Sequence, residues 1–266
     1  MNHVLITGAA SGIGRQLARR LAADAVRTGE PARLALLDRD TKGLEAVVKE
    51  LNGEAAEARA FEVDLAIPAS VDQAATDAIA WLGALDSVVS NAGIILSGPL
   101  TELSVEDWDL AFNVNTRAAW LLGRVCHDSL AEGGGSMVIV ASLAATAATG
   151  GMGAYSPSKA AVRMLSIQLA REWGGDGIRV NCVSPGSTAT GLTSNIFADS
   201  AVREARAATI PLGRIGEPED VADVIAFLIG PDARFVTGAD VAVDGGWGAA
   251  LVPGGIGVSP VGDVAR

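Results

Sequence analysis

Residues 4–14 read VLITGAASGIG, a short apolar run followed by a turn that contains three glycines. A run of Val, Leu and Ile favours a strand buried on both faces of a sheet, and a helical pattern starts after the turn. Glycines let the backbone turn tightly and approach a pyrophosphate at the start of the next helix. The stretch therefore predicts a dinucleotide-binding unit, with cofactor contacts from Gly8, Ser11, Gly12, Ile13 and Gly14.

An acidic residue, Asp38, ends the second predicted strand. A carboxylate there can accept hydrogen bonds from the adenosine ribose hydroxyls, and it repels a 2′-phosphate. Arg39 follows directly; its guanidinium could weaken that discrimination or cover the adenine face. We therefore expect NAD rather than NADP as the cofactor. The structural alternative is that Asp38 only caps the following helix.

Short apolar runs alternate with helical patterns along the rest of the chain. The alternation predicts an α/β fold, a Rossmann-type doubly wound sheet of about seven parallel strands in three α/β/α layers. We expect a single domain over residues 1–248, followed by a C-terminal tail at 249–266 that is either flexible or packed on another subunit. The predicted strands cover residues 4–6, 33–37, 58–61, 85–90, 137–141, 178–183 and 240–243, and the helices lie near 12–27, 41–51, 69–82, 104–131, 153–173 and 218–229.

Composition and charge exclude several classes of protein. The 266 residues carry 20 basic and 31 acidic side chains, whereas a nucleic-acid binder needs a concentrated basic patch. The cysteines, Cys126 and Cys182, and the histidines, His3 and His127, show no metal-site spacing. No uncharged apolar run is long enough to span a membrane, and no signal peptide precedes the first strand. We expect a cytoplasmic protein without a metal, bound to neither nucleic acid nor membrane.

Polar turns follow two further strands. Asp64 and Leu65 come after the third, and Asn91-Ala92-Gly93 comes after the fourth. Ligands of open α/β sheets bind at the carboxyl ends of the strands, so these turns are expected at the cofactor. Asp, Asn and Gly also end strands for local reasons alone, which is the alternative interpretation.

The single tyrosine of the chain, Tyr155, precedes Lys159 by four residues. Residues four apart share one face of a helix, and a neighbouring ammonium group lowers the pKa of a phenol from its ordinary value near 10. The pair is a plausible proton-transfer device; a tyrosine beside a solvated lysine is the alternative. Because Pro157 lies between them and proline is tolerated in a first turn, the helix is predicted to begin only just before Tyr155.

These landmarks together resemble the short-chain dehydrogenase/reductase family. The resemblance covers about residues 1–248 and implies a seven-stranded Rossmann-type sheet, usually in a homotetramer. It also implies hydride transfer between a nicotinamide and an alcohol or carbonyl. One departure is Ser90, which replaces a second asparagine before Asn91. The matching positions are the glycine turn, Asp64, Asn91-Ala92-Gly93, Asn115, Ser142, Tyr155 with Lys159, and Pro185-Gly186 with Thr190.

The resemblance also implies a role for each catalytic position. Tyr155 would be the acid/base, and Lys159 would lower its pKa and hold the nicotinamide ribose. Ser142 would hydrogen-bond the substrate oxygen, and Asn115 would hold a water that links Lys159 to solvent. Asp64 would touch the adenine. The other implied cofactor contacts are Leu65, Asn91, Ala92, Gly93, Pro185, Gly186, Thr188 and Thr190.

The substrate is less well defined by the sequence. Residues 187–208 lie where the family places a mobile lid, and they offer Leu192, Ile196 and Phe197 as an apolar wall. We expect a small alcohol or ketone, with a weak similarity to dihydrodihydroxybenzoate and secondary-alcohol dehydrogenases. Arg206 and Arg214 are candidates for contacting a carboxylate, although neither marks such a site clearly. The other expected pocket residues are Leu143, Met152 and Ser187.

Two alternatives remain open. A 3-oxoacyl-acyl-carrier reductase would require NADPH and a basic surface for an acidic carrier, and both Asp38 and the net charge of −11 count against it. A redox sensor that binds NAD without turnover would not need Ser142, Tyr155 and Lys159 together.

Overall fold

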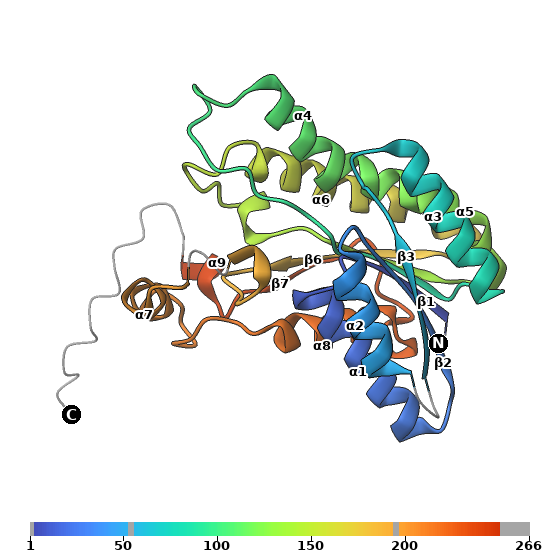
Figure 1. Ribbon diagram of the computed structural model, residues 1–266. Helices are drawn as coiled ribbons and strands as arrows, with labels where there is room; N and C mark the ends of the chain where they lie inside the picture. Colours follow the sequence, from blue (N-terminus) through green and yellow to red (C-terminus); the bar gives the residue numbers. More distant parts are fainter. Residues whose placement is uncertain (1–2, 53–55, 194–196, 251–266) are drawn as a thin grey trace.

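The computed structural model describes residues 3–52, 56–193 and 197–250, which are built around one parallel β-sheet (Figure 1). The strand order in this seven-stranded sheet is β3-β2-β1-β4-β5-β6-β7. The predicted Rossmann-type doubly wound sheet is therefore confirmed. The strands are β1 (His3–Thr7), β2 (Ala32–Asp38), β3 (Ala56–Glu62), β4 (Ser87–Ser90), β5 (Ser136–Val140), β6 (Arg179–Pro185) and β7 (Asp240–Val243).

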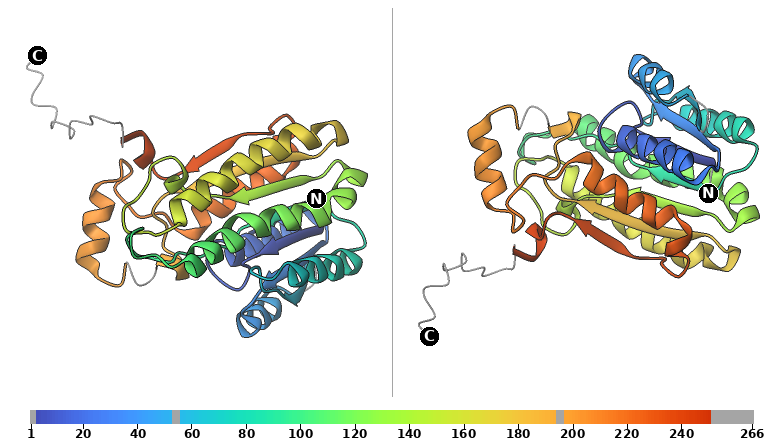
Figure 2. Two further views of the ribbon diagram at one scale, coloured as in Figure 1. Left: turned by 90° about the horizontal axis from the view of Figure 1, so that it is seen from above. Right: turned by 90° about the horizontal axis from the view of Figure 1, so that it is seen from below.

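Helices cover both faces of the sheet, as the three views in Figures 1 and 2 show. Successive strand residues point to opposite faces, so Leu5 joins one hydrophobic core while Ile6 joins the other. One face packs against α3 (Pro68–Leu82), α5 (Ala118–Gly133) and α6 (Tyr155–Trp173), and the other against α1 (Gly12–Thr28), α2 (Thr41–Leu51) and α8 (Pro218–Ile229).

The order of strands reverses between β1 and β4, which pair in parallel from Val4↔Ser87 to Ile6↔Val89, while β1 pairs with β2 along its other edge.

 Residues 8–86, a stretch of 79 residues, lie between the end of β1 and the start of β4. At such a switch point, the turns that follow the neighbouring strands open away from one another and leave a crevice at the carboxyl edge of the sheet. The turns after β1 and β4 therefore frame the position at which a ligand is expected.

Two helical regions differ from the prediction. The single helix expected near residues 104–131 is α4 (Val105–Phe112), a π-helical turn (Asn113–Arg117) and then α5. One inserted residue is enough to make a π turn, and such an insertion is not visible in the hydrophobic period. The expected lid segment contains a helix that the sequence reading missed, α7 (Ser200–Ala208), whose N-cap residue Asp199 accepts a hydrogen bond from the backbone of Ala201.

Other expectations agree with the structure. Helix α6 begins at Tyr155, which leaves Pro157 in its first turn. Cys126 and Cys182, which we expect to be small buried side chains in a reducing compartment, are buried free cysteines. The helix α9 (Trp247–Ala250) ends the described chain, and most of the tail expected at 249–266 lies outside the described residues.

Within the described ranges, no helix is both long and apolar enough to cross a bilayer. The same residues contain no group of three or more His, Cys, Asp or Glu side chains that could hold a metal ion.

Candidate active site

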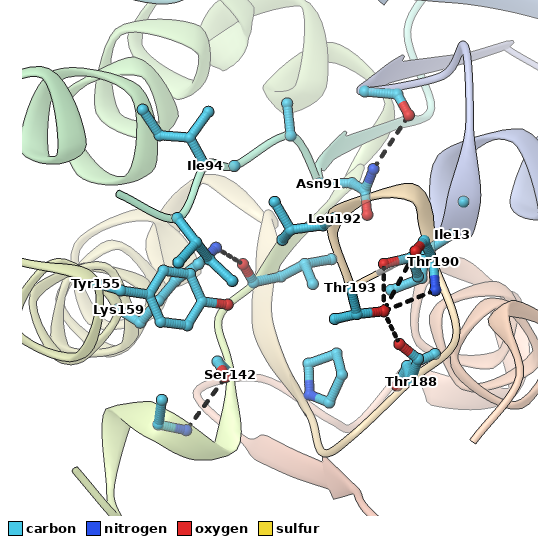
Figure 3. Close-up of a pocket in the computed structure, with 18 of the residues that line it drawn as sticks. Ile13, Asn91, Ile94, Ser142, Tyr155, Lys159, Thr188, Thr190, Leu192 and Thr193 are labelled. Atoms are coloured by element: carbon cyan, nitrogen blue, oxygen red, sulfur yellow. Dashed lines mark hydrogen bonds between the residues drawn. The ribbon is translucent and has the colours of Figure 1, made fainter. Parts of the chain in front are cut away.

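A cavity of about 1010 Å³ lies at the carboxyl ends of the strands (Figure 3). Ser142, Tyr155 and Lys159 lie together on one side of it, and Thr188, Thr190 and Thr193 lie on another. Besides Ser142, Tyr155, Lys159, Thr188 and Thr190, the predicted residues that line it are Gly8, Ser11, Gly12, Ile13, Asp38, Arg39, Asp64, Leu65, Asn91, Ala92, Gly93, Leu143, Met152, Pro185, Gly186, Ser187, Leu192 and Phe197.

Three predicted residues stand apart from this set. Gly14 and Asn115 are not among the residues that line the cavity. Ile196 lies outside the described residues, so its predicted place in the substrate pocket stays untested.

The glycine turn is held against Asn91. The Asn91 Nδ2 donates hydrogen bonds to the carbonyl oxygens of Thr7, at 3.0 Å, and Gly8, at 3.3 Å. A Cβ added to Gly8 would lie 2.7 Å from that nitrogen, and one added to Gly14 would lie 2.3 Å from the Gly8 oxygen. Gly14 therefore acts by close packing of the turn, which keeps the cradle open for a phosphate group.

Asp38 is bound by the backbone on both oxygens. Its Oδ2 accepts from the Ala10 amide at 3.1 Å, and its Oδ1 accepts from the Asp40 amide at 3.1 Å. An ionised carboxylate can accept about four hydrogen bonds, so two acceptor positions are still available in the cavity. Asp38 is thus fixed in orientation and can still receive the two hydroxyls of a ribose.

The second polar cluster contains the predicted catalytic residues. Tyr155 is 8% exposed and Lys159 is 3% exposed. The Lys159 Nζ lies 5.8 Å from the centre of the Tyr155 ring and donates to the Val140 carbonyl at 2.8 Å. The Ser142 Oγ accepts from the Ala144 amide at 3.1 Å, so its own hydrogen can point to another acceptor.

The expected lowering of the tyrosine pKa is wrong for the chain by itself. Burial raises the pKa of Tyr155, and a hydrogen bond with Ser142 only opposes that increase. Burial also lowers the pKa of Lys159 to about 8. The physical reason is that both groups are removed from water, and desolvation disfavours the charged form of each.

Asn115 is buried in the π-helical turn, where its side chain organises the loop after β4. Its Oδ1 accepts from the Ile94 amide at 2.8 Å, while its Nδ2 donates to the Ile94 carbonyl and to the Ser158 hydroxyl, both at 3.0 Å. These contacts engage both ends of the amide. The water-holding role expected from the resemblance stays a prediction.

Gly93 lies close to the side chains of both Asn115 and Lys159. A Cβ at Gly93 would be 3.1 Å from the Asn115 Oδ1 and 3.1 Å from the Lys159 Nζ. We expect Gly93→Ala to reduce kcat/KM about tenfold, because a small displacement of a catalytic group is costly. The measurement is steady-state kinetics beside Gly133→Ala, whose added Cβ would meet no atom within 4 Å. Equal kinetics for the two variants would contradict the expectation.

The sequence reading missed Thr193 and Trp247. The Thr193 Oγ1 donates to the Thr188 carbonyl at 2.6 Å and accepts from the Thr190 amide at 3.0 Å, so it orders the loop after β6. The only available signal was the local backbone bonding typical of threonine. Trp247 lines the cavity from α9, at the edge of the segment read as a tail.

Comparisons with known proteins agree with this geometry. A family model described as Enoyl-(Acyl carrier protein) reductase matches residues 8–248. D-threitol dehydrogenase of Mycolicibacterium smegmatis is 38% identical over 91% of this chain and 91% of its own length. The 2,5-dichloro-2,5-cyclohexadiene-1,4-diol dehydrogenase LinX of Sphingobium indicum is 34% identical over 91% of this chain and 94% of its own length.

One similar solved structure contains a bound nicotinamide cofactor. A blue fluorescent protein from a metagenomic library, in complex with NADPH, superposes with a TM-score of 0.82 at 37% identity. The match covers 92% of this chain and 97% of that chain. The likeness therefore extends over most of the chain.

Proposed function

This chain belongs to the short-chain dehydrogenase/reductase family, and on that premise we propose that it is an NAD-dependent dehydrogenase that interconverts a secondary alcohol and its ketone. Its relatives are named as dehydrogenases, so it is an oxidoreductase that acts on a CH–OH group. One observation carries the finer proposal. Ser142, Tyr155 and Lys159 meet in the same cavity that Asp38 and the glycine turn line.

The residues of the chain suit a nicotinamide dinucleotide. The glycine turn would hold the pyrophosphate, Asp38 the adenosine ribose and Lys159 the nicotinamide ribose. The absence of side chains at Gly8 and Gly14 is what allows the backbone to approach so closely. When bound, the nicotinamide supplies the hydride acceptor or donor.

Proton transfer is assigned to the chain's own groups. In the oxidative direction, the Tyr155 oxygen removes the proton of the substrate hydroxyl, while the Ser142 hydroxyl donates a hydrogen bond to the substrate oxygen. The charge of the Lys159 ammonium would favour the phenolate, against the burial that raises the pKa of Tyr155. Such positioned acid–base groups typically contribute about 10²–10⁴-fold to the rate.

The proposed preference for NAD rests on the charge of Asp38. We expect Asp38→Asn to lower the ratio of kcat/KM for NAD⁺ to that for NADP⁺ at least about tenfold, because a like-charge contact with the 2′-phosphate is removed. The measurement is the kinetics of both cofactors with one alcohol.

Asp64→Asn is the matched control for this change. Asp64 also lines the cavity, and its Oδ1 accepts from the Ala66 amide at 2.9 Å. Loss of its charge should change both cofactors alike. A wild-type preference for NADP⁺, or an unchanged ratio in Asp38→Asn, would overturn the interpretation of Asp38.

Apolar side chains around the reaction centre support a cyclic or aromatic alcohol as substrate. Leu143, Met152 and Phe197 line the same cavity as Ser142 and Tyr155, and burying a ring against such side chains is favourable. The named activity of LinX on a cyclohexadiene diol supports the same class. The intact trio of Ser142, Tyr155 and Lys159 argues against a redox sensor without turnover.

An acyl-carrier reductase is the second candidate, because the matching family model carries that description. The net charge of −11 argues against docking of an acidic carrier. A screen at alkaline pH decides between them. Secondary, cyclic and aromatic alcohols are offered with NAD⁺, in parallel with NADP⁺, and a 3-oxoacyl thioester is offered with NADPH. Turnover of the thioester alone would refute the alcohol proposal.

Assembly and location are proposed from the family resemblance alone. We infer a homotetramer in the cytoplasm. Light scattering coupled to size-exclusion chromatography measures the assembly, and a monomer at micromolar concentration would refute the first part. Fractionation of the source cells tests the second.

A further inference from the structure

We propose that Arg206 binds an anionic carboxylate of the substrate, so that the preferred alcohol is a hydroxy acid with an apolar body between its two polar ends. The inference rests on the proposed function and names the substrate class of the same site. The sequence alone did not decide whether Arg206 or Arg214 contacts a carboxylate. The structure distinguishes Arg206 from the neighbouring arginines.

Arg206 is a cavity-lining cation without an acidic partner among the described residues. It lies on α7, and the structure shows no ion pair or hydrogen bond from its guanidinium within those residues. Two nearby arginines are different. Arg203 contacts Glu217 at 3.2 Å, and Arg214 forms a two-pronged contact with Asp220 at 2.6 and 2.7 Å. Arg214 is thereby removed as a candidate for a substrate contact.

A tryptophan holds the Arg206 guanidinium in place. Its central carbon lies 4.7 Å from the centre of the Trp247 ring, a distance typical of a cation–π contact. Both side chains line the cavity. A guanidinium stacked in this way keeps its edge N–H groups free to donate two parallel hydrogen bonds to a carboxylate.

Hydrogen bonds fix the backbone of residues 244–248, the segment that carries Trp247. The Asp244 carboxylate accepts from the amides of Gly246, at 2.9 Å, and Gly248, at 2.7 Å. The Leu212 amide donates to the Gly245 carbonyl at 3.1 Å, which ties the segment after α7 to the segment before α9. Helices α7 and α9 also lie side by side in the views of Figures 1 and 2.

The segment that carries Trp247 lies next to the residues of the reaction centre. A Cβ added to Gly248 would lie 2.8 Å from the Leu143 Cδ1, so α9 packs directly on the residue that follows Ser142. Arg206 is therefore linked to the Ser142 side of the cavity through Trp247, its neighbour Gly248, and Leu143. The remaining ionisable residues of the cavity are Asp38, Arg39, Asp40, Asp64, Tyr155 and Lys159, which lie on the other segments that line it.

The side chains around Arg206 indicate which kind of substrate the cavity would bind. An apolar surface near Leu143 and Trp247 suits a ring or short hydrocarbon, whereas a lone guanidinium at its border suits one negative charge. A neutral alcohol would leave that cation without a counter-charge when water is excluded. A hydroxy acid satisfies both ends of the site.

The test uses matched substrates that differ only in charge. These are 4-hydroxycyclohexanecarboxylate with its carboxamide, and 3-(1-hydroxyethyl)benzoate with its benzamide, each offered with NAD⁺ to the full chain. We expect wild type to prefer the carboxylate of at least one pair by about 10- to 100-fold in kcat/KM, mainly through KM, which is typical of a hydrogen bond to a charged group. Arg206→Met should lose this preference and retain turnover of the neutral partner.

Arg203→Met is the matched control on the same helix, because Arg203 does not line the cavity. It should retain the preference for the carboxylate. In both variants KM for NAD⁺ should stay unchanged; an increase confined to Arg206→Met would instead assign the arginine to the cofactor and overturn the proposal. Equal kcat/KM for acid and amide in wild type would also overturn it.

A binding measurement separates this inference from the proposed activity. Cyclohexanecarboxylate and cyclohexanecarboxamide are titrated calorimetrically into the chain with NADH. Tighter binding of the acid, lost in Arg206→Met and retained in Arg203→Met, supports the carboxylate site even where no alcohol is oxidised. Turnover of neutral alcohols without any acid preference in binding leaves the proposed activity standing and refutes the site.

Discussion

Tyr155→Phe is expected to lower kcat by about 100- to 10,000-fold, the range that a positioned acid–base group contributes. The phenylalanine keeps the buried ring and removes only the hydroxyl, which hydrogen-bonds Ser142. The cavity wall and the cofactor contacts should therefore remain. The measurement is NADH production with an alcohol found in the screen, together with calorimetric binding of NADH.

Full binding of NADH with lost turnover would assign the chemistry to the phenol. Comparable kcat in the variant would refute that role. Ser156→Ala, a neighbouring hydroxyl removal on α6, is the control; its Oγ accepts from the Thr149 amide at 3.4 Å, and Ser156 does not line the cavity. We expect this variant to keep near wild-type kcat.

The same variant isolates the ionisation of the phenol. Because the chain contains one tyrosine, tyrosinate absorbance reports Tyr155 alone, and Tyr155→Phe provides the blank. Burial raises the pKa of Tyr155, so tyrosinate in the free protein should form at higher pH than for an exposed tyrosine. Addition of NAD⁺ should shift the titration to lower pH, since a nearby positive charge favours the phenolate.

Local chemistry explains why much of the site could be predicted. The glycines of the first turn, Asp38 at the end of β2 and Asn91 at the end of β4 are each specified by a few adjacent residues. Parallel strands then bring their carboxyl ends to one edge of the sheet, so these residues meet without any further information. Tyr155 and Lys159 share a face because the helix that holds them begins at Tyr155.

The features that were missed depend on contacts between distant segments. Arg206 and Trp247 meet only when α7 and α9 pack together, and nothing near either residue in the sequence indicates that contact. The side chain of Asn115, within the π turn, bonds Ile94, which lies 21 residues earlier in the sequence. The direction of the Tyr155 pKa follows from burial, which a four-residue spacing cannot reveal.

Lys159→Met is expected to abolish most activity and to stabilise the fold. Activity should fall at least about 100-fold, as for removal of one electrostatic donor from an active site. The lysine is buried, and burial lowers its pKa from 10.5 to about 8. At pH 7 that difference corresponds to about 3 kcal/mol of unfolding free energy lost by keeping the ammonium charged.

The variant removes that cost and loses one hydrogen bond, from the Lys159 Nζ to the Val140 carbonyl, worth about 1 kcal/mol. The expected balance is a melting temperature roughly 2–4 °C above wild type at pH 7. Lys49→Met, at an exposed position on α2, is the control and should change neither activity nor melting temperature.

The gain in melting temperature from Lys159→Met is expected to depend on pH. Lys159 is protonated in both the folded and the unfolded chain below about pH 8, so the full cost of burying its charge is present there. Between about pH 8 and 10.5 the folded chain releases the proton while the unfolded chain still holds it, and the wild-type contribution to stability rises. The advantage of Lys159→Met should therefore shrink across this window. A melting temperature of Lys159→Met below that of wild type at pH 7, with a difference independent of pH, would contradict the prediction. It would show that Lys159 stabilises the fold, so that its role in catalysis has no cost in stability.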